Sequence, residues 1–265
     1  MNHKGRNNQE REYGYMGIDT TKTVVTQKRG QYVTGYSVGI LYLDGCWYPV
    51  IPGNVANLCT YDFPVRLKVV PDCKTSRLLS GDFTLLDSVI KAAKELEAEG
   101  ARAISAACGF FGNFQDQVAA AVDIPVYLSS VVQVPWIKTG LKPNQKIGML
   151  TAYAKGITPR LFESCGVHDP GICIVQDLSG MPEFSAIIED RGTFDNEKLR
   201  QEVIGAAVEL VNNNPDIGAI LLECSDLPPY ASDIQRAVKL PVFDFITLIR
   251  WIHFATSQKP YYGFI

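Results

Sequence analysis

The sequence of 265 residues lacks the features that mark several protein classes. No apolar run approaches the roughly 18 residues that a membrane helix needs, and residues 1–14 lack the apolar stretch of a secretory signal. The formal net charge of −3 gives no general attraction to nucleic acid or to anionic lipid. We therefore expect a cytoplasmic protein whose partner is a small molecule, not nucleic acid or a membrane.

Familiar cofactor and metal motifs are also missing. The sequence contains no GxGxxG, no GxxxxGK[ST] and no GxSxG, so it gives no support to dinucleotide, P-loop nucleotide or serine-hydrolase chemistry. It has three scattered histidines, and its seven cysteines form no CxxC pair, which argues against structural zinc and against a disulfide framework. We expect no cofactor and no metal, with most thiols reduced and packed as small hydrophobic groups.

Apolar strand-like runs alternate with helical stretches along most of the chain. Apolar residues make up 46% and charged residues 20%, as in an ordinary globular protein. Near-continuous apolar strands separated by helices predict an α/β fold with mostly parallel sheet covered on both faces. Expected strands include ARAISAA, KIGMLTA and IGAILLEC, and expected helices include residues 84–99, 114–122, 131–139, 195–213 and a final helix from Phe245. In such sheets, ligands bind beyond the carboxyl ends of the strands.

The most informative positive feature is a duplication that carries a cysteine in each copy. GARAISAACGFF in the first half parallels DIGAILLECSDL in the second, and each run delivers a cysteine, Cys108 or Cys224, at the carboxyl end of an apolar strand. The match continues upstream, where IKAAKEL parallels IGAAVEL, and downstream, where AVDIPVY parallels AVKLPVF. The duplication predicts two pseudo-symmetric lobes with a thiol on each side of a shared cleft.

The duplication also suggests how the chain is divided. We expect an amino-terminal arm over residues 1–34 that packs on the body or on a neighbouring subunit. The first lobe is expected to comprise residues 35–137 together with 241–265, and the second lobe residues 138–240. The long arm is a candidate contact for a homo-oligomer, with a dimer favoured.

Two opposed thiols suit proton transfer at carbon. Racemisation needs a base on one face of a carbon acid and an acid on the opposite face, and matched cysteines can exchange these roles after each turnover. A helix amino terminus near each thiol is expected to lower its pKa toward neutrality. Glu223 and Asp226 flank Cys224 and would instead raise that pKa, unless they face away or bind a cation. Simple packing of both cysteines is the alternative to catalysis.

These residues resemble those of a known group of enzymes. SAACGF, LLECSDLP and the loop PGNVANLCTYDFPV make residues 36–254 similar to the cofactor-independent Asp/Glu/hydantoin racemase superfamily. The resemblance implies two α/β lobes, an active site in the cleft between them, and Cys108 and Cys224 as the catalytic acid/base pair. Gly109 and Phe110 stand where amino-acid racemases commonly carry Asn-Thr. This departure leaves only backbone donors there and weakens the assignment of an amino-acid substrate.

The resemblance also suggests residues that bind the substrate. Ser225 matches the small hydroxyl residue after the second cysteine, and Gly109 and Phe110 would contribute backbone N–H groups. Asn54 and Thr60 lie in the equivalent of the amino-terminal substrate loop, although both also suit an ordinary turn. Two further residues belong to LTAY, which resembles a carboxylate-binding turn of the decarboxylase and isomerase branches: Thr151 and Tyr153, with a helix cap and a packed ring as the alternative.

The leading hypothesis is a racemase or epimerase of a small carboxylate, with aspartate or glutamate the favoured substrate and no pyridoxal phosphate involved. A decarboxylase or a cis-trans isomerase of the same superfamily is the second hypothesis, although a decarboxylase needs only one acid. The third is a protein that binds a carboxylate metabolite without catalysis. The substrate, the stereochemical preference and the oligomer number remain open.

Overall fold

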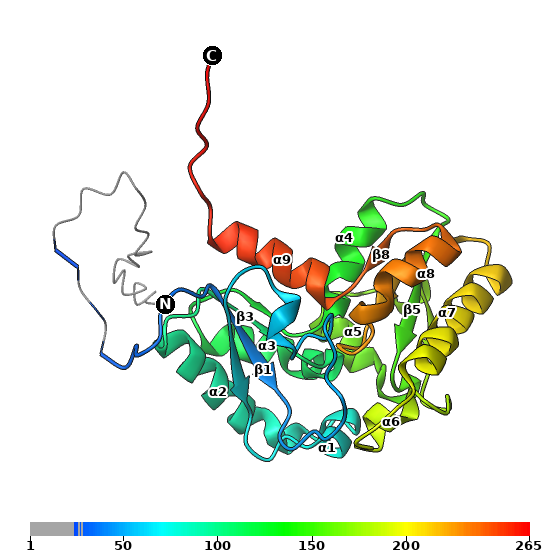
Figure 1. The fold of residues 1–265 in the computed structure, drawn as a ribbon, viewed down its shortest axis with the longest axis horizontal. Coiled ribbons are helices and arrows are strands. Elements are labelled where there is room, and N and C mark those ends of the chain that lie inside the picture. The colour runs from blue at the N-terminus through cyan, green and yellow to red at the C-terminus, as the bar shows by residue number, and fades with distance from the viewer. Residues whose placement is uncertain (1–23, 26, 28) are drawn as a thin grey trace, which may run out of the picture.

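The computed structural model describes Val24, Val25, Gln27 and residues 29–265, and it contains two parallel sheets of four strands each (Figure 1). The strand order is β2-β1-β3-β4 in the first sheet and β6-β5-β7-β8 in the second. The two orders are the same once the duplication is taken into account, because β5 to β8 repeat β1 to β4. The predicted α/β fold with two lobes is confirmed. Most of the predicted arm lies outside the described residues.

Each lobe alternates strands with helices. The first sheet contains β1 (Val38–Tyr42), β2 (Val65–Val69), β3 (Ala103–Ala106) and β4 (Val126–Tyr127), with α1 (Thr75–Leu79), α2 (Leu86–Ala98) and α3 (Gln115–Ala121) between its strands. The second contains β5 (Lys146–Thr151), β6 (Cys173–Asp177), β7 (Ile217–Leu222) and β8 (Val242–Phe243). The remaining helices are α4 (Val134–Thr139), α5 (Pro159–Ser164), α6 (Ser185–Ile188), α7 (Asn196–Asn213), α8 (Ala231–Val238) and α9 (Phe245–Thr256).

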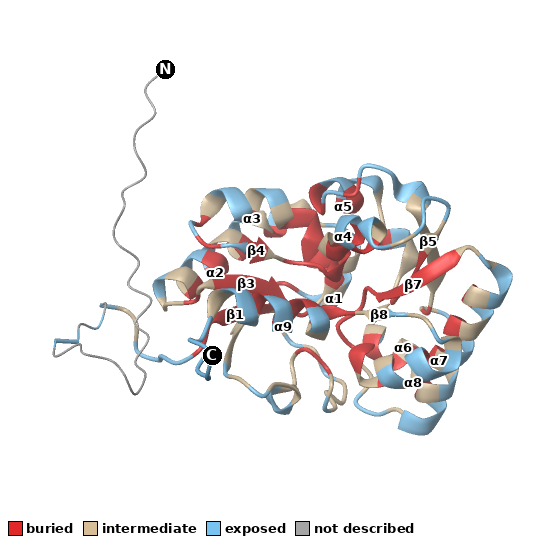
Figure 2. Ribbon diagram, turned by 90° about the horizontal axis from the view of Figure 1, so that it is seen from above, coloured by how far each residue is buried: buried red, intermediate tan, exposed pale blue. Residues whose placement is uncertain are grey.

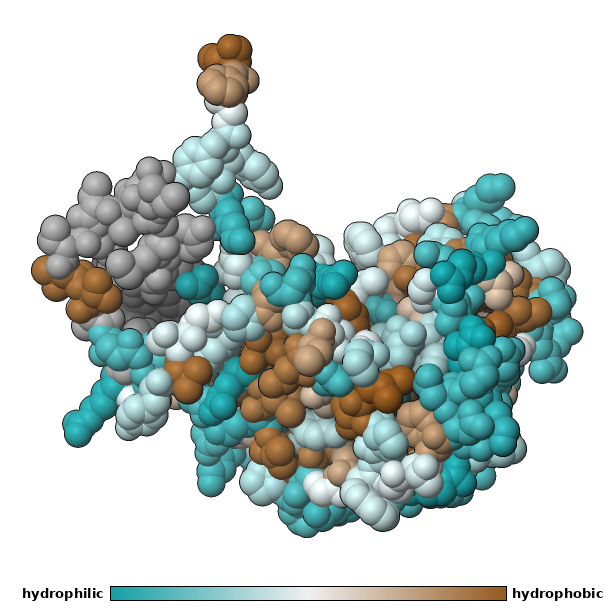
Figure 3. Space-filling model, in the orientation of Figure 1, coloured by the Kyte–Doolittle hydropathy of each residue, from teal (hydrophilic) through white to brown (hydrophobic). Residues whose placement is uncertain are grey.

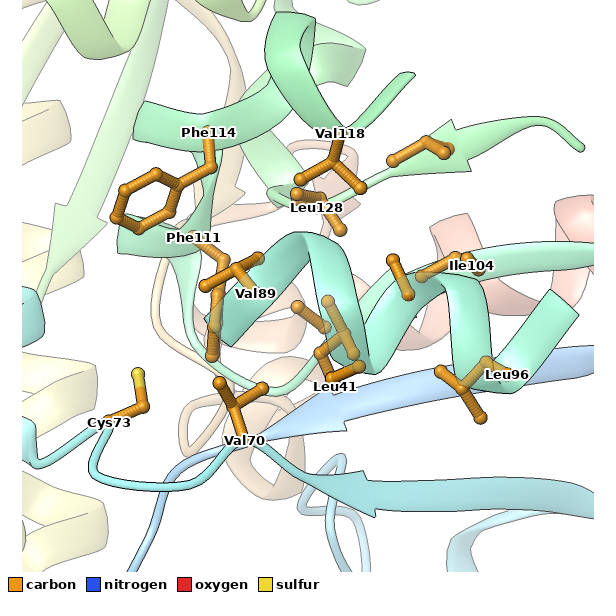
Figure 4. Close-up of a cluster of buried hydrophobic side chains, with 14 of the residues drawn as sticks. Leu41, Val70, Cys73, Val89, Leu96, Ile104, Phe111, Phe114, Val118 and Leu128 are labelled. Carbon is orange, nitrogen blue, oxygen red and sulfur yellow. The ribbon is translucent and has the colours of Figure 1, made fainter. Parts of the chain in front are cut away.

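The first sheet is buried on both faces because its strands alternate between two hydrophobic clusters. Leu41 of β1 packs with α2 and α3, whereas Val38 and Ile40 pack with α9. Helix α2 presents a regular apolar stripe of Val89, Ala92, Ala93 and Leu96 to the first of these clusters, as helical periodicity requires. Figure 4 shows Val89, Leu96, Leu41 and Ile104 in this cluster, and Figure 2 shows β1 and β3 as buried. The strands β2, β6 and β8 are only partly buried.

The two lobes exchange a helix. Val134 and Ile137 of α4, which follows the first sheet, pack against β5 of the second sheet. Helix α9 follows the second sheet and packs on the first through Phe245, Leu248 and Ile249. The chain thus crosses between lobes before residue 131 and after β8, whereas the sequence placed these crossings at 137 and 241. Each exchanged helix ties one lobe to the other beside the cleft.

One strand and two short helices were not expected from the sequence. β2 was not among the expected strands, because VRLKV alternates apolar and basic residues at the edge of the sheet and so lacks a continuous apolar run. Arg66 of β2 pairs with Glu99 at 2.8 Å, so it supports the edge of the first lobe and does not face the cleft. Helices α1 and α6, which follow β2 and β6, are too short to give a periodic signal.

Helix α7 offers a simple test of the local structure. Gly205 lies exposed in its middle, and a Cβ built there would meet no atom within 4 Å. Figure 3 shows that the flank of the molecule over α7 is mainly hydrophilic, as expected for a solvated helix face. Gly205→Ala should therefore raise the free energy of unfolding by about 0.5 to 1 kcal/mol, because glycine costs a helix more backbone entropy than alanine. Urea denaturation will measure the shift, and a lower stability would contradict it.

Candidate active site between the lobes

The carboxyl ends of β3 and β7 meet at one small cavity. Cys108 follows β3 directly before the turn of 3-10 helix at Gly109–Phe114, and Cys224 follows β7. Both cysteines line the cavity, which has a volume of about 30 Å³ and room for about two water molecules. The lining residues are Leu43, Tyr48, Thr75, Leu79, Cys108, Gly109, Phe110, Ala152, Ile187, Ile188, Glu223, Cys224, Ser225 and Asp226. Helices α1 and α6, equivalent elements of the two lobes, close one side of it (Figure 1).

The two sulfur atoms have matched backbone surroundings. The N–H of Phe110 donates a hydrogen bond to Cys108, and the N–H of Asp226 donates one to Cys224. In both lobes, therefore, the donor is the residue two positions after the cysteine. Such a hydrogen bond favours the thiolate. The duplication thus extends from the strands to the immediate contacts of the sulfur atoms.

The expectation of a lowered thiol pKa is wrong. Burial raises the pKa of Cys108 well above its ordinary value, and the Glu223 carboxylate raises it further. Burial likewise raises the pKa of Cys224, with Asp226 and then Glu223 adding to the effect. Cys108 lines the cavity and keeps part of its surface accessible. Desolvation and two neighbouring carboxyl groups outweigh one backbone donor, so both thiols rest protonated near neutral pH.

The two carboxyl groups differ in how fully they are bonded. The Asp226 carboxyl accepts hydrogen bonds from Asn54, Tyr48, Ser225 and Cys224, the last at 3.4 Å between Sγ and Oδ2. Glu223 is completely buried, and its Oε2 accepts a hydrogen bond of 2.8 Å from the Thr151 hydroxyl. Its Oε1 has no hydrogen-bond partner among the described residues. Burial, with a contribution from Asp226, raises the pKa of Glu223 to about 7.

Gly109 leaves the space that Glu223 occupies. A Cβ built at Gly109 would reach 2.5 Å from Cδ of Glu223 and 2.7 Å from its backbone oxygen, closer than real Cβ contacts allow. Any other residue at this position would have to displace the carboxyl group. The glycine that follows Cys108, in place of a polar residue, thus leaves room for the carboxyl group of Glu223 beside Cys224.

The residues predicted to bind substrate fall into two groups. Gly109, Phe110 and Ser225 line the cavity. The other four predicted residues do not line the cavity, but two of them form hydrogen bonds with residues that line it. Asn54 donates to Asp226, and Thr151 donates to Glu223, so these two position the carboxyl groups.

The remaining two predicted residues have contacts that suit a structural role. The Thr60 hydroxyl accepts from the N–H of Gly53 and donates to the Asn54 carbonyl, which closes the loop that carries Asn54. Tyr153 packs against the hydrophobic cluster of the first lobe. A substrate contact by either residue stays a prediction.

Sequence reasoning missed Tyr48 and Thr75, which come from the loop after β1 and from the start of α1. Tyr48 donates to Asp226, and burial raises its pKa, so its hydroxyl stays protonated. The segment CWYPV before the PGN turn gave no periodic signal that would have assigned it to the cavity. Of the described residues, no lysine, arginine or histidine lines this cavity. The two carboxyl groups of the cavity lining therefore have no basic side chain of that lining beside them.

A larger hollow of about 460 Å³ lies elsewhere on the first lobe. Arg102 and Pro125, which line it, precede β3 and β4, so it lies at the amino ends of these strands. Ligands of parallel sheets bind at the opposite edge, and this hollow contains neither cysteine. The smaller cavity between the lobes is therefore the candidate active site. No helix in the described part of the chain is long and apolar enough to cross a membrane.

Comparisons with known proteins agree with this geometry. Residues 86–251 match the family model of the Asp/Glu/hydantoin racemases. The chain is 31% identical over 238 residues to dimethylsulfoniopropionate lyase 7 of Emiliania huxleyi (strain CCMP1516), covering 86% of this chain and 69% of that protein. It is 30% identical over 237 residues to a dimethylsulfoniopropionate lyase of Durusdinium sp. clade D, covering 86% and 77%. A structure of an arylmalonate decarboxylase variant shares the fold, with a TM-score of 0.57, 18% identity and coverage of 86% and 98%.

Proposed function

This chain belongs to the Asp/Glu/hydantoin racemase family, and we propose that within it the protein is a lyase that cleaves dimethylsulfoniopropionate into dimethyl sulfide and acrylate. Two curated lyases of this name align with 86% of the chain. The observation that carries the proposal is the charge of the cavity, where two thiols and two carboxyl groups stand without a basic side chain among the described residues. A zwitterion with a sulfonium group fits this environment.

The proposal changes the substrate favoured by the sequence. Aspartate and glutamate each bring two carboxylates, and a second carboxylate would need a cation or several donors in a buried site. Glu223 and Asp226 would instead repel it. The coarser conclusion, an enzyme of this family, stands, whereas an amino-acid racemase is not supported by the composition of the cavity.

The chemistry needs one base. In the proposed reaction, the thiolate of Cys224 removes a proton from the carbon next to the substrate carboxylate, and the electron pair forms the C=C bond as the C–S bond breaks. Dimethyl sulfide leaves as a neutral molecule, acrylate keeps the carboxylate charge, and the proton ends on Cys224 before release to solvent. Asp226, which accepts the hydrogen bond of the Cys224 thiol, is placed to take its proton beforehand.

The high thiol pKa suits this role. A thiolate that is costly to form in a dry, acidic site is also a stronger base toward a weakly acidic C–H bond. A sulfonium cation bound beside it would stabilise the thiolate by Coulomb attraction, so the base would form mainly when substrate is present. Thr75 offers a hydroxyl donor on the cavity wall for the carboxylate, and the Ser225 hydroxyl would serve there only by giving up its hydrogen bond to Asp226. Because the cavity is small, binding requires the lining of α1 and α6 to move apart.

Product analysis will test the proposed reaction. Incubation with dimethylsulfoniopropionate should release dimethyl sulfide, measured in the headspace by gas chromatography, together with an equal amount of acrylate, measured by proton NMR. Parallel samples of aspartate and glutamate in deuterated water should keep their α-protons. Loss of those α-protons, with no dimethyl sulfide from the sulfonium substrate, would refute the lyase.

Racemisation is the second candidate function, and the matched cysteines favour it. Both thiols line one cavity and each sulfur accepts an N–H bond from the residue two positions on, the equivalence that a two-base reaction needs. A lyase needs only one of the two. The same NMR samples decide between the functions.

A further inference from the structure

We propose that Glu223 forms a subsite for a positively charged group, and that it selects substrates whose far end is a cation over uncharged analogues of the same shape. The inference rests on the proposed function, in which this cation is the sulfonium group. The sequence named binding of a cation by Glu223 or Asp226 as one alternative, and the proposal assigns this role to Glu223.

The Glu223 carboxyl group has one oxygen that accepts a hydrogen bond and one that does not, among the described residues. Its side chain has no solvent-exposed surface, and the Thr151 hydroxyl fixes Oε2 at 2.8 Å. Oε1 has no hydrogen-bond partner among the described residues, although the residue lines the cavity. An unpartnered carboxylate oxygen in a dry site is costly, so a ligand that supplies positive charge there would be bound strongly.

The surroundings assign this task to Glu223 and not to Asp226. Asp226 already accepts four side-chain hydrogen bonds, which leave it little capacity for a ligand. Among the described residues, the Glu223 carboxyl accepts a side-chain hydrogen bond only from Thr151, and its Oε1 occupies the space left by the missing Cβ of Gly109. The fold thus anchors one carboxyl oxygen of Glu223 and leaves the other, beside the cavity, without a hydrogen-bond partner among the described residues.

The groups that face Glu223 cannot neutralise it. Its titratable neighbours are Asp226, Cys108, Cys224 and Cys165, all of which are neutral or negative. With no basic side chain in the cavity lining among the described residues, the compensating charge has to come from the ligand. Because the pKa of Glu223 is about 7, binding of a cation near neutral pH would release a proton from the fraction that is protonated.

Two unreactive ligands separate charge from shape. In 3-(trimethylammonio)propionate a quaternary ammonium replaces the sulfonium, and in 4,4-dimethylpentanoate an uncharged carbon with the same three methyl groups replaces the nitrogen. Isothermal titration of the full chain should show that the cationic ligand binds more tightly. Its advantage should shrink as the pH falls from about 8 to about 6, since Glu223 is ionised above its pKa and protonated below it.

Glu223→Gln should lower the affinity for the ammonium ligand by about tenfold or more and leave that for 4,4-dimethylpentanoate nearly unchanged, because only the charge is removed. The pH dependence of the preference should disappear as well. Glu209→Gln, an exposed change on α7, is the matched control and should alter neither affinity. An unchanged preference in Glu223→Gln would overturn the proposal.

The outcomes distinguish this proposal from the lyase itself. If Glu223→Gln does not fold, the pH dependence of the wild-type preference decides, and a preference that stays constant between about pH 6 and 8 rejects the subsite. If the charge preference behaves as expected but dimethylsulfoniopropionate is not cleaved, the cation subsite stands and the proposed reaction falls.

Discussion

Cys224→Ser should lower kcat/KM for dimethylsulfoniopropionate by about a thousandfold or more, since a positioned general base contributes about 10² to 10⁴ and a serine hydroxyl does not ionise near neutral pH. The structure supports Cys224 as the base because its sulfur contacts both the Asp226 carboxyl and the Asp226 N–H. Initial rates of dimethyl sulfide release will give the change, and thermal unfolding will show whether the variant retains its stability.

Cys108→Ser provides the contrast that identifies the reaction. A lyase with one base should lose less activity from this change, about tenfold, because Cys108 would only help to hold the substrate. A two-base reaction would lose activity equally from either change. Cys59→Ser is the matched control, because Cys59 is exposed in the loop after β1 and does not line the cavity.

If Cys224→Ser retains more than about a tenth of wild-type activity, Cys224 is not the base.

The sequence was sufficient for the fold because the relevant signals are local or repeated. Apolar strands such as KIGMLTA and the helix capped by Asp195 are specified within a few residues, and both are found where they were expected. The duplication then placed Cys108 and Cys224 in equivalent positions without any knowledge of distances. The local patterns and the duplication can both be recognised in a single sequence, because neither depends on how the two lobes pack together.

The electrostatics of the site could not be predicted in the same way. The sign of each thiol pKa shift depends on the sum of burial, a backbone donor and the carboxyl groups of Glu223 and Asp226, and only the packed structure fixes that sum. Glu223 was visible as a neighbour of Cys224, but its fit against Gly109 joins residues 114 positions apart. Tyr48 reaches Asp226 from a loop with no periodic pattern. Long-range contacts of this kind leave no trace in a single sequence.

Gly109→Ala should nearly abolish activity, although it adds only one methyl group. The new Cβ would overlap the Glu223 carboxyl group and approach the Glu223 backbone oxygen to 2.7 Å, so the change cannot be absorbed by rotation of the side chain alone. Displacement of catalytic groups by about 1 Å can cost about a hundredfold in rate, and we expect a loss of at least that size in kcat/KM. Overpacking should also lower the free energy of unfolding by about 1 to 3 kcal/mol.

Two comparisons separate the loss of the cation subsite from a general loss of structure. Gly205→Ala adds the same methyl group to an exposed helix and should leave activity unchanged. If Gly109→Ala acts by displacing Glu223, it should also lose the preference for 3-(trimethylammonio)propionate over 4,4-dimethylpentanoate, as Glu223→Gln should. A folded Gly109→Ala variant that keeps both its activity and this preference would show that the carboxyl group has room to move, and that the glycine is not needed to seat it.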